Sequence, residues 1–198
     1  MTWENLQQLQ YRVDFIEQFF AKMGASMTAV DLCCGSPEYL DENADQIATS
    51  IVNFPACFGE YACCDINYGE SRQIEYAIEN GEWDGEQTAF CRFVNKPDDQ
   101  FAREDVEKCD VLLVLGHGGF EIDHNAKESS TLTESAHHVI NEFKPSYIVL
   151  ESVVAYTPII DCIMLTHRQS YVRVKELRTY NTERWVFDRK LTILERSE

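Results

Sequence analysis

The feature that most constrains this chain is a regular alternation between short apolar runs and segments with helical spacing. The apolar runs, each typical of a buried strand, lie at 28–34, 60–66, 88–94, 111–115 and 147–154. The segments that follow them predict helices, at 38–52, 71–80, near 98–107, 131–143 and near 157–165. Strands that alternate with helices favour a parallel sheet with helices on both faces.

The two ends of the sequence depart from this alternation. Residues 3–23 carry apolar side chains in steps of three and four, which predicts an amphipathic helix that Gly24 is well placed to end. Near the other end, 171–180 and 185–195 are long alternating segments whose connection is too short for a helix. They predict an antiparallel hairpin.

The expected organisation is therefore a single domain over residues 1–198. It consists of an N-terminal helix (1–24), a series of β/α units (28–167) and a terminal β-hairpin (171–196). A chain of this length is long enough to bury most of its apolar surface in one core.

The charge of the chain is strongly negative and unevenly spread. The net charge is −17, and residues 1–100 hold 18 acidic against 5 basic residues. Such a surface repels phosphate backbones and anionic lipid, so we expect neither nucleic acid nor membrane as a partner. Residues 168–198 are the exception, with eight basic and five acidic residues, which is consistent with a local anion-facing patch or a solvated hairpin face.

Cysteine spacing and the N-terminal sequence indicate a reducing compartment. The eight cysteines form no C-x-x-C pair, and most of them lie in apolar runs where a reduced cysteine packs as a small hydrophobe. The N-terminus lacks the basic start and apolar block of a signal peptide. We expect a cytoplasmic protein without a structural metal site.

Ligands of doubly wound sheets bind beyond the carboxyl ends of the strands, so the residues that follow each strand are the candidates. Asp31 ends the first apolar run and is followed by a tight turn that contains Gly35. Asp65 follows the second run, where an acid can accept hydrogen bonds from a ribose diol. Asn95 follows the third run and can both donate and accept, as an adenine edge requires.

These residues and their order resemble the class I S-adenosylmethionine-dependent methyltransferases. The stretch "VDLCCGSPEYL" resembles their first motif, and "CCDIN" resembles the acid after their second strand. The stretch "CDVLLVLGHGGF", with the later "FKPSYIVLES", resembles their fourth and fifth strands. The similarity covers roughly residues 28–196. It implies a three-layer Rossmann-like methyltransferase fold, with a mostly parallel seven-stranded sheet that ends in an antiparallel β-hairpin.

The resemblance also implies a cofactor, S-adenosylmethionine, and residues that bind it. Asp31, Gly35 and Ser36 would line the methionine side, Asp65 the ribose and Asn95 the adenine. The residues of the family's glycine motif are here Cys33, Gly35 and Pro37, so only the middle glycine is present. Pro37 suits the first turn of a helix but removes one N–H donor.

The loop 116–130 lies where the family places the transferred methyl group, which makes Gly116 a candidate cofactor contact. His117 follows it and is the candidate general base, because its pKa near neutrality suits proton transfer from an oxygen or nitrogen acceptor. The alternative is a polar loop histidine without a chemical role. A metal site built from this loop has suitable residue types but no fixed geometry, so no metal is predicted.

The function predicted from the sequence is methylation of a small-molecule acceptor by an S-adenosylmethionine-dependent methyltransferase. Two alternatives stay open. One is a non-catalytic binding protein that keeps the fold, which the changes at Cys33 and Pro37 suggest. The other is a different reaction of the same cofactor, such as lyase chemistry. The oligomeric state is not predicted.

Overall fold

The computed structural model describes residues 3–32, 57–64, 91–94, 101–115, 126–153, 158–179 and 189–197. The strands of this part form one sheet and are β1 (Thr28–Leu32), β2 (Glu60–Cys64), β3 (Cys91–Val94), β4 (Val111–Val114), β5 (Tyr147–Val153), β6 (Tyr171–Thr179) and β7 (Arg189–Arg196). The helices are α1 (Trp3–Phe20), α5 (Ala126–Phe143) and α6 (Pro158–Thr166), with a short 3-10 turn, η1 (Gly24–Ser26).

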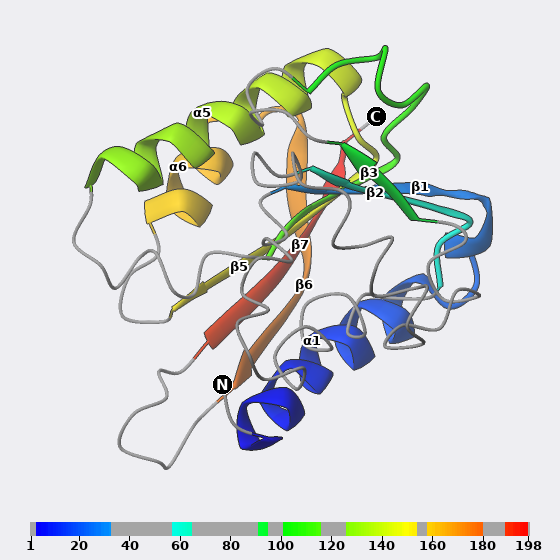
Figure 1. Cartoon of the computed structure of the whole chain (residues 1–198). Coiled ribbons are helices and arrows are strands. Elements are labelled where there is room, and N and C mark those ends of the chain that lie inside the picture. The colour runs from blue at the N-terminus through cyan, green and yellow to red at the C-terminus, as the bar shows by residue number, and fades with distance from the viewer. Residues whose placement is uncertain are drawn as a thin grey trace, which may run out of the picture.

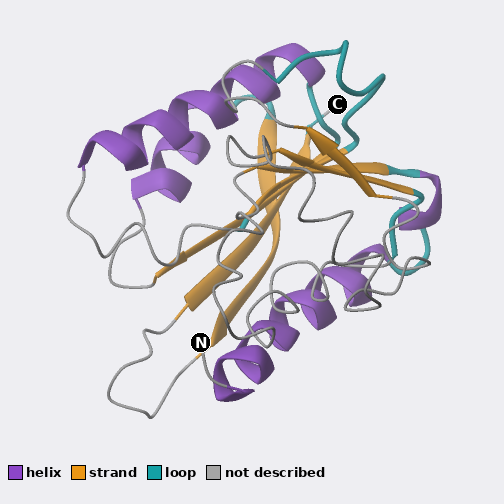
Figure 2. Cartoon of the chain, viewed as in Figure 1, coloured by secondary structure: helices purple, strands orange, loops and turns teal. Residues whose placement is uncertain are grey.

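The strands are arranged in the order β3-β2-β1-β4-β5-β7-β6. Figures 1 and 2 show them as one sheet between the helices. The first five of these are mutually parallel, and β7 runs antiparallel to both of its neighbours. The predicted sheet is confirmed: it has seven strands, is mostly parallel and ends in an antiparallel hairpin. The order reverses between β1 and β4, because the chain first builds outward to β3 and then returns to the other side of β1.

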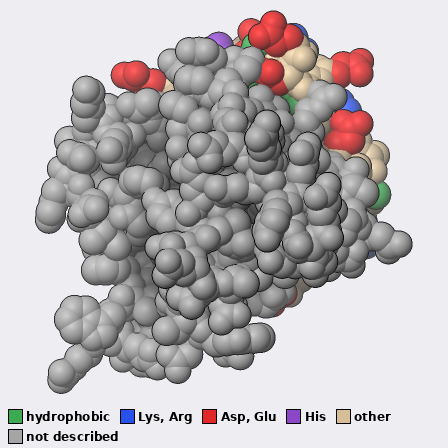
Figure 3. Space-filling view, in the orientation of Figure 1, with side chains coloured by type: hydrophobic (Ala, Val, Ile, Leu, Met, Phe, Trp, Pro, Cys, Tyr) green, Lys and Arg blue, Asp and Glu red, His purple; other side chains and the backbone are tan. Residues whose placement is uncertain are grey.

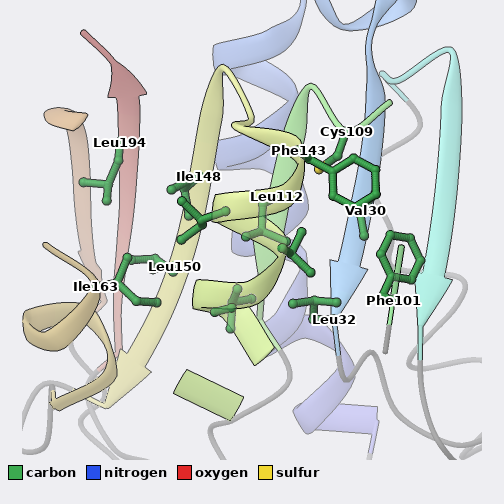
Figure 4. Close-up of a cluster of buried hydrophobic side chains, with 14 of the residues drawn as sticks. Val30, Leu32, Phe101, Cys109, Leu112, Phe143, Ile148, Leu150, Ile163 and Leu194 are labelled. Carbon is green, nitrogen blue, oxygen red and sulfur yellow. The ribbon is translucent and has the colours of Figure 1, made fainter. Parts of the chain in front are cut away.

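Helices lie on both faces of the sheet, with α5 and α6 on one side and α1 on the other (Figure 1). Successive strand residues point to opposite faces, so each buried strand supplies both layers. Figure 4 shows the α5 and α6 layer, in which Val30, Leu112 and Ile148 from adjacent strands meet Phe143 of α5 and Ile163 of α6.

The α1 layer is formed by the alternate residues of the same strands. Phe15, Ile16 and Phe20 of α1 are buried in a cluster with Leu113 of β4 and Val149 of β5. Each such fully buried side chain contributes about 1.5–3 kcal/mol to folding relative to an exposed one. Over the side chains of α1 that the structure describes, 12–20, the predicted apolar stripe is therefore the surface that holds the helix against the sheet.

The end of α1 differs from the prediction, since the helix stops at Phe20. Gly24 begins η1 instead, and its position is explained by close packing, because a Cβ there would lie 2.5 Å from the carbonyl oxygen of Cys57. Gly59 makes the reciprocal approach, and its N–H donates to the carbonyl oxygens of Met27 and Gly24 at 3.1 and 3.2 Å. Two glycines thus allow the segments before β1 and β2 to touch.

The helix predicted near 98–107 is wrong over its described residues, 101–107, which contain a turn at 103–105 and no helix. Asp105 explains the difference, because its carboxylate accepts a hydrogen bond from the Ala102 N–H at 2.8 Å and its own N–H donates to the Ala102 carbonyl at 2.9 Å. This local closure lets Phe101 and Val106 both enter the core. In contrast, α5 begins at Ala126, earlier than predicted. Residues 126–130 are mostly good helix formers, but they carry no apolar stripe from which the helix could be predicted.

The helices predicted at 38–52 and 71–80 lie outside the described residues. Among the residues that are described, no helix has the length and apolar character needed to cross a bilayer. On the described part of the face in Figure 3, acidic side chains are prominent, as the net charge of −17 leads one to expect.

Candidate functional site

The reversal of strand order between β1 and β4 marks where a ligand site is expected on a sheet of this kind. At such a point the chain leaves the two adjacent strands in opposite directions, which opens a crevice at their carboxyl ends. Of the residues predicted for the site, Asp31 alone is in the described part of the chain. The others, Gly35, Ser36, Asp65, Asn95, Gly116 and His117, lie outside the described residues.

Asp31 lies near the carboxyl end of β1, at the strand-order reversal. It is paired with Leu113 of β4 on one side and with Cys63 of β2 on the other. The residue is buried, with 8% of its surface exposed. A carboxylate inside a sheet that is otherwise apolar at this level is costly unless it is hydrogen-bonded.

The hydroxyl of Tyr61 provides such a bond, donating to Asp31 Oδ2 at 2.7 Å. Tyr61 is paired with Ala29, two residues before Asp31, so both side chains lie on the α1 face and the phenol reaches along the sheet to the carboxylate. The tyrosine is 1% exposed, and its ring packs near that of Phe58 at 6.3 Å between centroids. The carboxylate is thereby held in a fixed orientation.

A second buried acid lies on the same face, at the carboxyl end of β5. Glu151 is 2% exposed and forms an ion pair with Arg12 of α1. It is two residues beyond Val149, which shares the pairing row of Leu113 and Asp31, so its side chain also faces α1. The ion pair therefore ties the N-terminal helix to the sheet edge where the candidate site lies.

Sequence reasoning assigned no role to Glu151 or Arg12. The available signal was a charged residue inside the apolar run "YIVLESVV", where a buried acid requires a partner. The partner was not identifiable from the sequence, because Arg12 lies 139 residues away.

The α1 face also carries a cation at its outer edge. The Lys175 ammonium of β6 lies 4.8 Å from the ring centroid of Phe15 and 5.8 Å from that of Phe19. These contacts hold α1 against the hairpin side of the sheet. They add to the ion pair of Arg12 with Glu151, which holds α1 at the carboxyl end of β5. Within the described ranges, no three His, Cys, Asp or Glu side chains are grouped as a metal ion would require.

Comparison with known proteins identifies the fold. No protein-family model matches the sequence, and no curated protein matches it significantly. Solved structures do match over nearly the whole chain, and seven of them superpose with TM-scores of 0.51–0.60 at 8–14% sequence identity.

The N-methyltransferase NodS from Bradyrhizobium japonicum WM9 superposes with a TM-score of 0.59 at 12% identity, and the match covers 96% of each chain. NodS has also been crystallised with S-adenosyl-l-homocysteine. The methyltransferase domain of bacterial CtHen1 gives a TM-score of 0.60 at 9% identity, covering 96% of this chain and 99% of that one. An rRNA methylase from Streptococcus thermophilus gives 0.51 at 8% identity, covering 95% of each chain.

These similarities show that the chain has the fold of the class I S-adenosylmethionine-dependent methyltransferases. The resemblance noted in the sequence is confirmed at that level. At identities this low the similarity establishes the architecture of the protein, and its ligand and reaction have to be argued from its own residues.

Proposed function

We propose that the protein is an S-adenosylmethionine-dependent methyltransferase. One observation carries the proposal: a buried carboxylate, Asp31, lies at the strand-order reversal of a sheet with the class I methyltransferase order. An acid at that position does not help the sheet to fold, because burying a carboxylate costs free energy.

The residues proposed to bind the cofactor follow successive strands at the carboxyl edge. They are Asp31, Gly35 and Ser36 for the methionine part, Asp65 for the ribose, Asn95 for the adenine and Gly116 at the loop after β4. Asp31 is the one residue of this set that the structure describes, and its carboxylate suits the charge of the ligand. S-adenosylmethionine carries an ammonium and a sulfonium, and the Asp31 carboxylate is an acceptor already oriented by Tyr61.

When bound, S-adenosylmethionine supplies an electrophilic methyl group on a sulfonium sulfur. We propose that His117 accepts the proton that an acceptor nitrogen or oxygen loses as it is methylated. Most of the rate enhancement would come from holding the acceptor in line, a contribution of about 7–11 kcal/mol. Arg12 and Glu151 would support this by fixing α1 beside the acceptor.

The proposed acceptor is a small molecule, handled in the cytoplasm. The net charge of −17 supports this, because a surface of that sign disfavours polyanions. The whole of residues 1–198 is proposed to act as one domain, which leaves no separate recognition domain within this sequence.

A second acceptor class, RNA, is favoured by a specific observation. Arg178 and Lys190 are cross-strand partners on β6 and β7, in the same row as Ser152 at the carboxyl end of β5, and both form ion pairs with Glu176. Lys190 is buried, so the exposed Arg178 is the cation that an RNA phosphate would meet there. The fold is also shared with an rRNA methylase. If RNA is the acceptor, its affinity should fall steeply with added salt, and that dependence separates the two classes.

The deciding experiment is calorimetric titration of the protein with S-adenosylhomocysteine. Under the proposal the wild type binds in the micromolar range and Asp65→Ala does not. Glu134→Ala serves as the matched control, because it removes an exposed acid from α5, which covers the face of the sheet opposite to α1. Absence of binding to a folded wild type would refute the proposal. Binding without methyl transfer to any tested acceptor would favour the non-catalytic or lyase alternatives.

A further inference from the structure

A cysteine and two histidines meet between α5 and α6, on the face of the sheet opposite α1. The Sγ of Cys162 lies 3.7 Å from Nε2 of His137, and Nδ1 of His137 lies 2.8 Å from Nε2 of His167. The imidazole rings are 5.0 Å apart between centroids. A thiol, a first imidazole and a second imidazole thus form a continuous hydrogen-bonded line.

This line has the order nucleophile, base and orienting group. An activated nucleophile requires a base within hydrogen-bond reach, and the base in turn must be held by a third group. His167 is itself positioned, because its ring meets that of Tyr171 edge to face with 6.2 Å between centroids. The Tyr171 hydroxyl is fixed by donation to the Pro145 carbonyl at 2.6 Å.

The two histidines can carry a proton along the line. In one tautomer the Nδ1–H of His137 donates to His167, which leaves His137 Nε2 as an acceptor for the thiol proton. Transfer of that proton to Nε2 lets the Nδ1 proton pass to His167, so the positive charge comes to rest one ring away from the sulfur. Burial lowers the pKa of both histidines, so both rings are neutral near neutral pH.

Exposure distinguishes Cys162 from the other cysteines with described side chains. Cys162 is exposed, whereas Cys57 is partly buried and Cys109 is buried. Burial, with the charge of Glu17, raises the pKa of Cys57 to about 12, and burial also raises the pKa of Cys109. Both are therefore protonated and poorly reactive near neutral pH.

The charged residues beside the line are few and exposed. Glu134 lies one turn before His137 on α5, Asp161 precedes Cys162 on α6, and Arg168 follows His167. Among the described residues, burial is the largest cause of the lowered pKa of His167 and the His137 ring adds to it, while burial lowers the pKa of His137.

We propose that Cys162 is a modification site that reacts with small disulfides, with His137 as its base and His167 as the positioning residue. The Cys162 thiol gives its proton to His137, and the sulfur attacks one sulfur of the disulfide. A new S–S bond forms to Cys162, the original S–S bond breaks, and the departing thiolate takes up the proton. The co-reactant is a low-molecular-weight disulfide. No methyl transfer is involved, so the site is separate from the proposed function.

The test is the rate at which oxidised glutathione modifies Cys162 in the full-length protein near neutral pH, with the site located by peptide mass spectrometry. The reference is a synthetic peptide of residues 158–166, which has the same local sequence without a histidine. Cys162 in the protein should react about tenfold faster than the peptide. This is below the ~10²–10⁴ that evolved acid–base catalysis supplies, because the Cys162 thiol is exposed to solvent.

Adjacent histidines give a matched pair of variants. His137→Gln should reduce the rate to that of the peptide, and His167→Gln should reduce it partly. His138→Gln should leave it unchanged, because His138 Nε2 contacts the Phe101 carbonyl oxygen at 3.0 Å instead. Equal rates in the wild type and His137→Gln would overturn the proposal.

A further measurement on the wild type holds even if a variant fails to fold. An unassisted thiol becomes reactive in step with a pKa of about 8.5. A wild-type profile of rate against pH that coincides with that of the peptide would refute the role of the histidines, and a profile displaced to lower pH would support it.

Discussion

Replacing Tyr61 by Phe tests whether the Asp31 carboxylate depends on a single buried hydroxyl. The substitution keeps the ring, and therefore its packing near Phe58, but removes the donor that lies 2.7 Å from Asp31 Oδ2. A hydrogen bond to a charged acceptor contributes about 1.5–3 kcal/mol, and the bond is buried. The free energy of unfolding should fall by that amount. For a chain of this size, about 2–4 °C per kcal/mol gives a decrease in Tm of roughly 3–12 °C.

The assay is urea denaturation followed by circular dichroism, with Tyr147→Phe as the matched control. The Tyr147 hydroxyl donates to Glu195 at 2.8 Å, but that residue is only partly buried, so its loss should cost less than about 1 kcal/mol. Titration with S-adenosylhomocysteine would show whether the same bond also orients Asp31 for the ligand. A loss for Tyr61→Phe no larger than that for Tyr147→Phe would refute the reasoning.

Three further predictions concern the backbone and the histidine pair. Gly59→Ala should lower the free energy of unfolding by about 1–3 kcal/mol, because its Cβ would lie 2.3 Å from the backbone oxygen of Ala25; an unchanged urea midpoint would contradict this. Lys144→Gly should raise stability by about 0.5–1 kcal/mol, since Lys144 has a φ of 51°, and Lys144→Ala should bring no such gain in the same assay. Because burial lowers the pKa of His137 and His167, the unfolded chain binds protons more readily than the folded one as pH falls below about 6.5. Stability should therefore decrease in that range, and His137→Gln should weaken this decrease in thermal unfolding at a series of pH values.

Most of the sheet was predictable because its signals are local. Continuous apolar runs such as 111–115 indicate strands buried on both faces, and the long alternating segments near the end indicate a hairpin. The turn at 101–107 was not predictable from periodicity, because it depends on one side chain, Asp105, which closes the backbone on itself. The early start of α5 was missed because residues 126–130 have no apolar stripe.

The candidate site was only partly predictable, and the reason is distance along the sequence. Asp31 was found because it lies near the end of an apolar run, shortly before a turn that contains a glycine. The bonds that hold the site in place join residues far apart, as in the ion pair of Arg12 with Glu151 and the bond of Tyr61 to Asp31. No local pattern states which partner a buried acid will meet once the strands are aligned.

The position of β7 has a consequence for how the protein is made. β7 comes after every other described strand in the chain, yet it lies between β5 and β6 and supplies Ile193 and Leu194 to opposite layers of the interior. During translation β6 leaves the ribosome before β7 and cannot join the sheet until β7 arrives, because β7 is the one described strand with which it pairs. Until then the edge of β5 is open, and an open edge is a template for pairing with another chain. The nascent protein is therefore exposed to misassembly along β5 until β7 has emerged and paired with it.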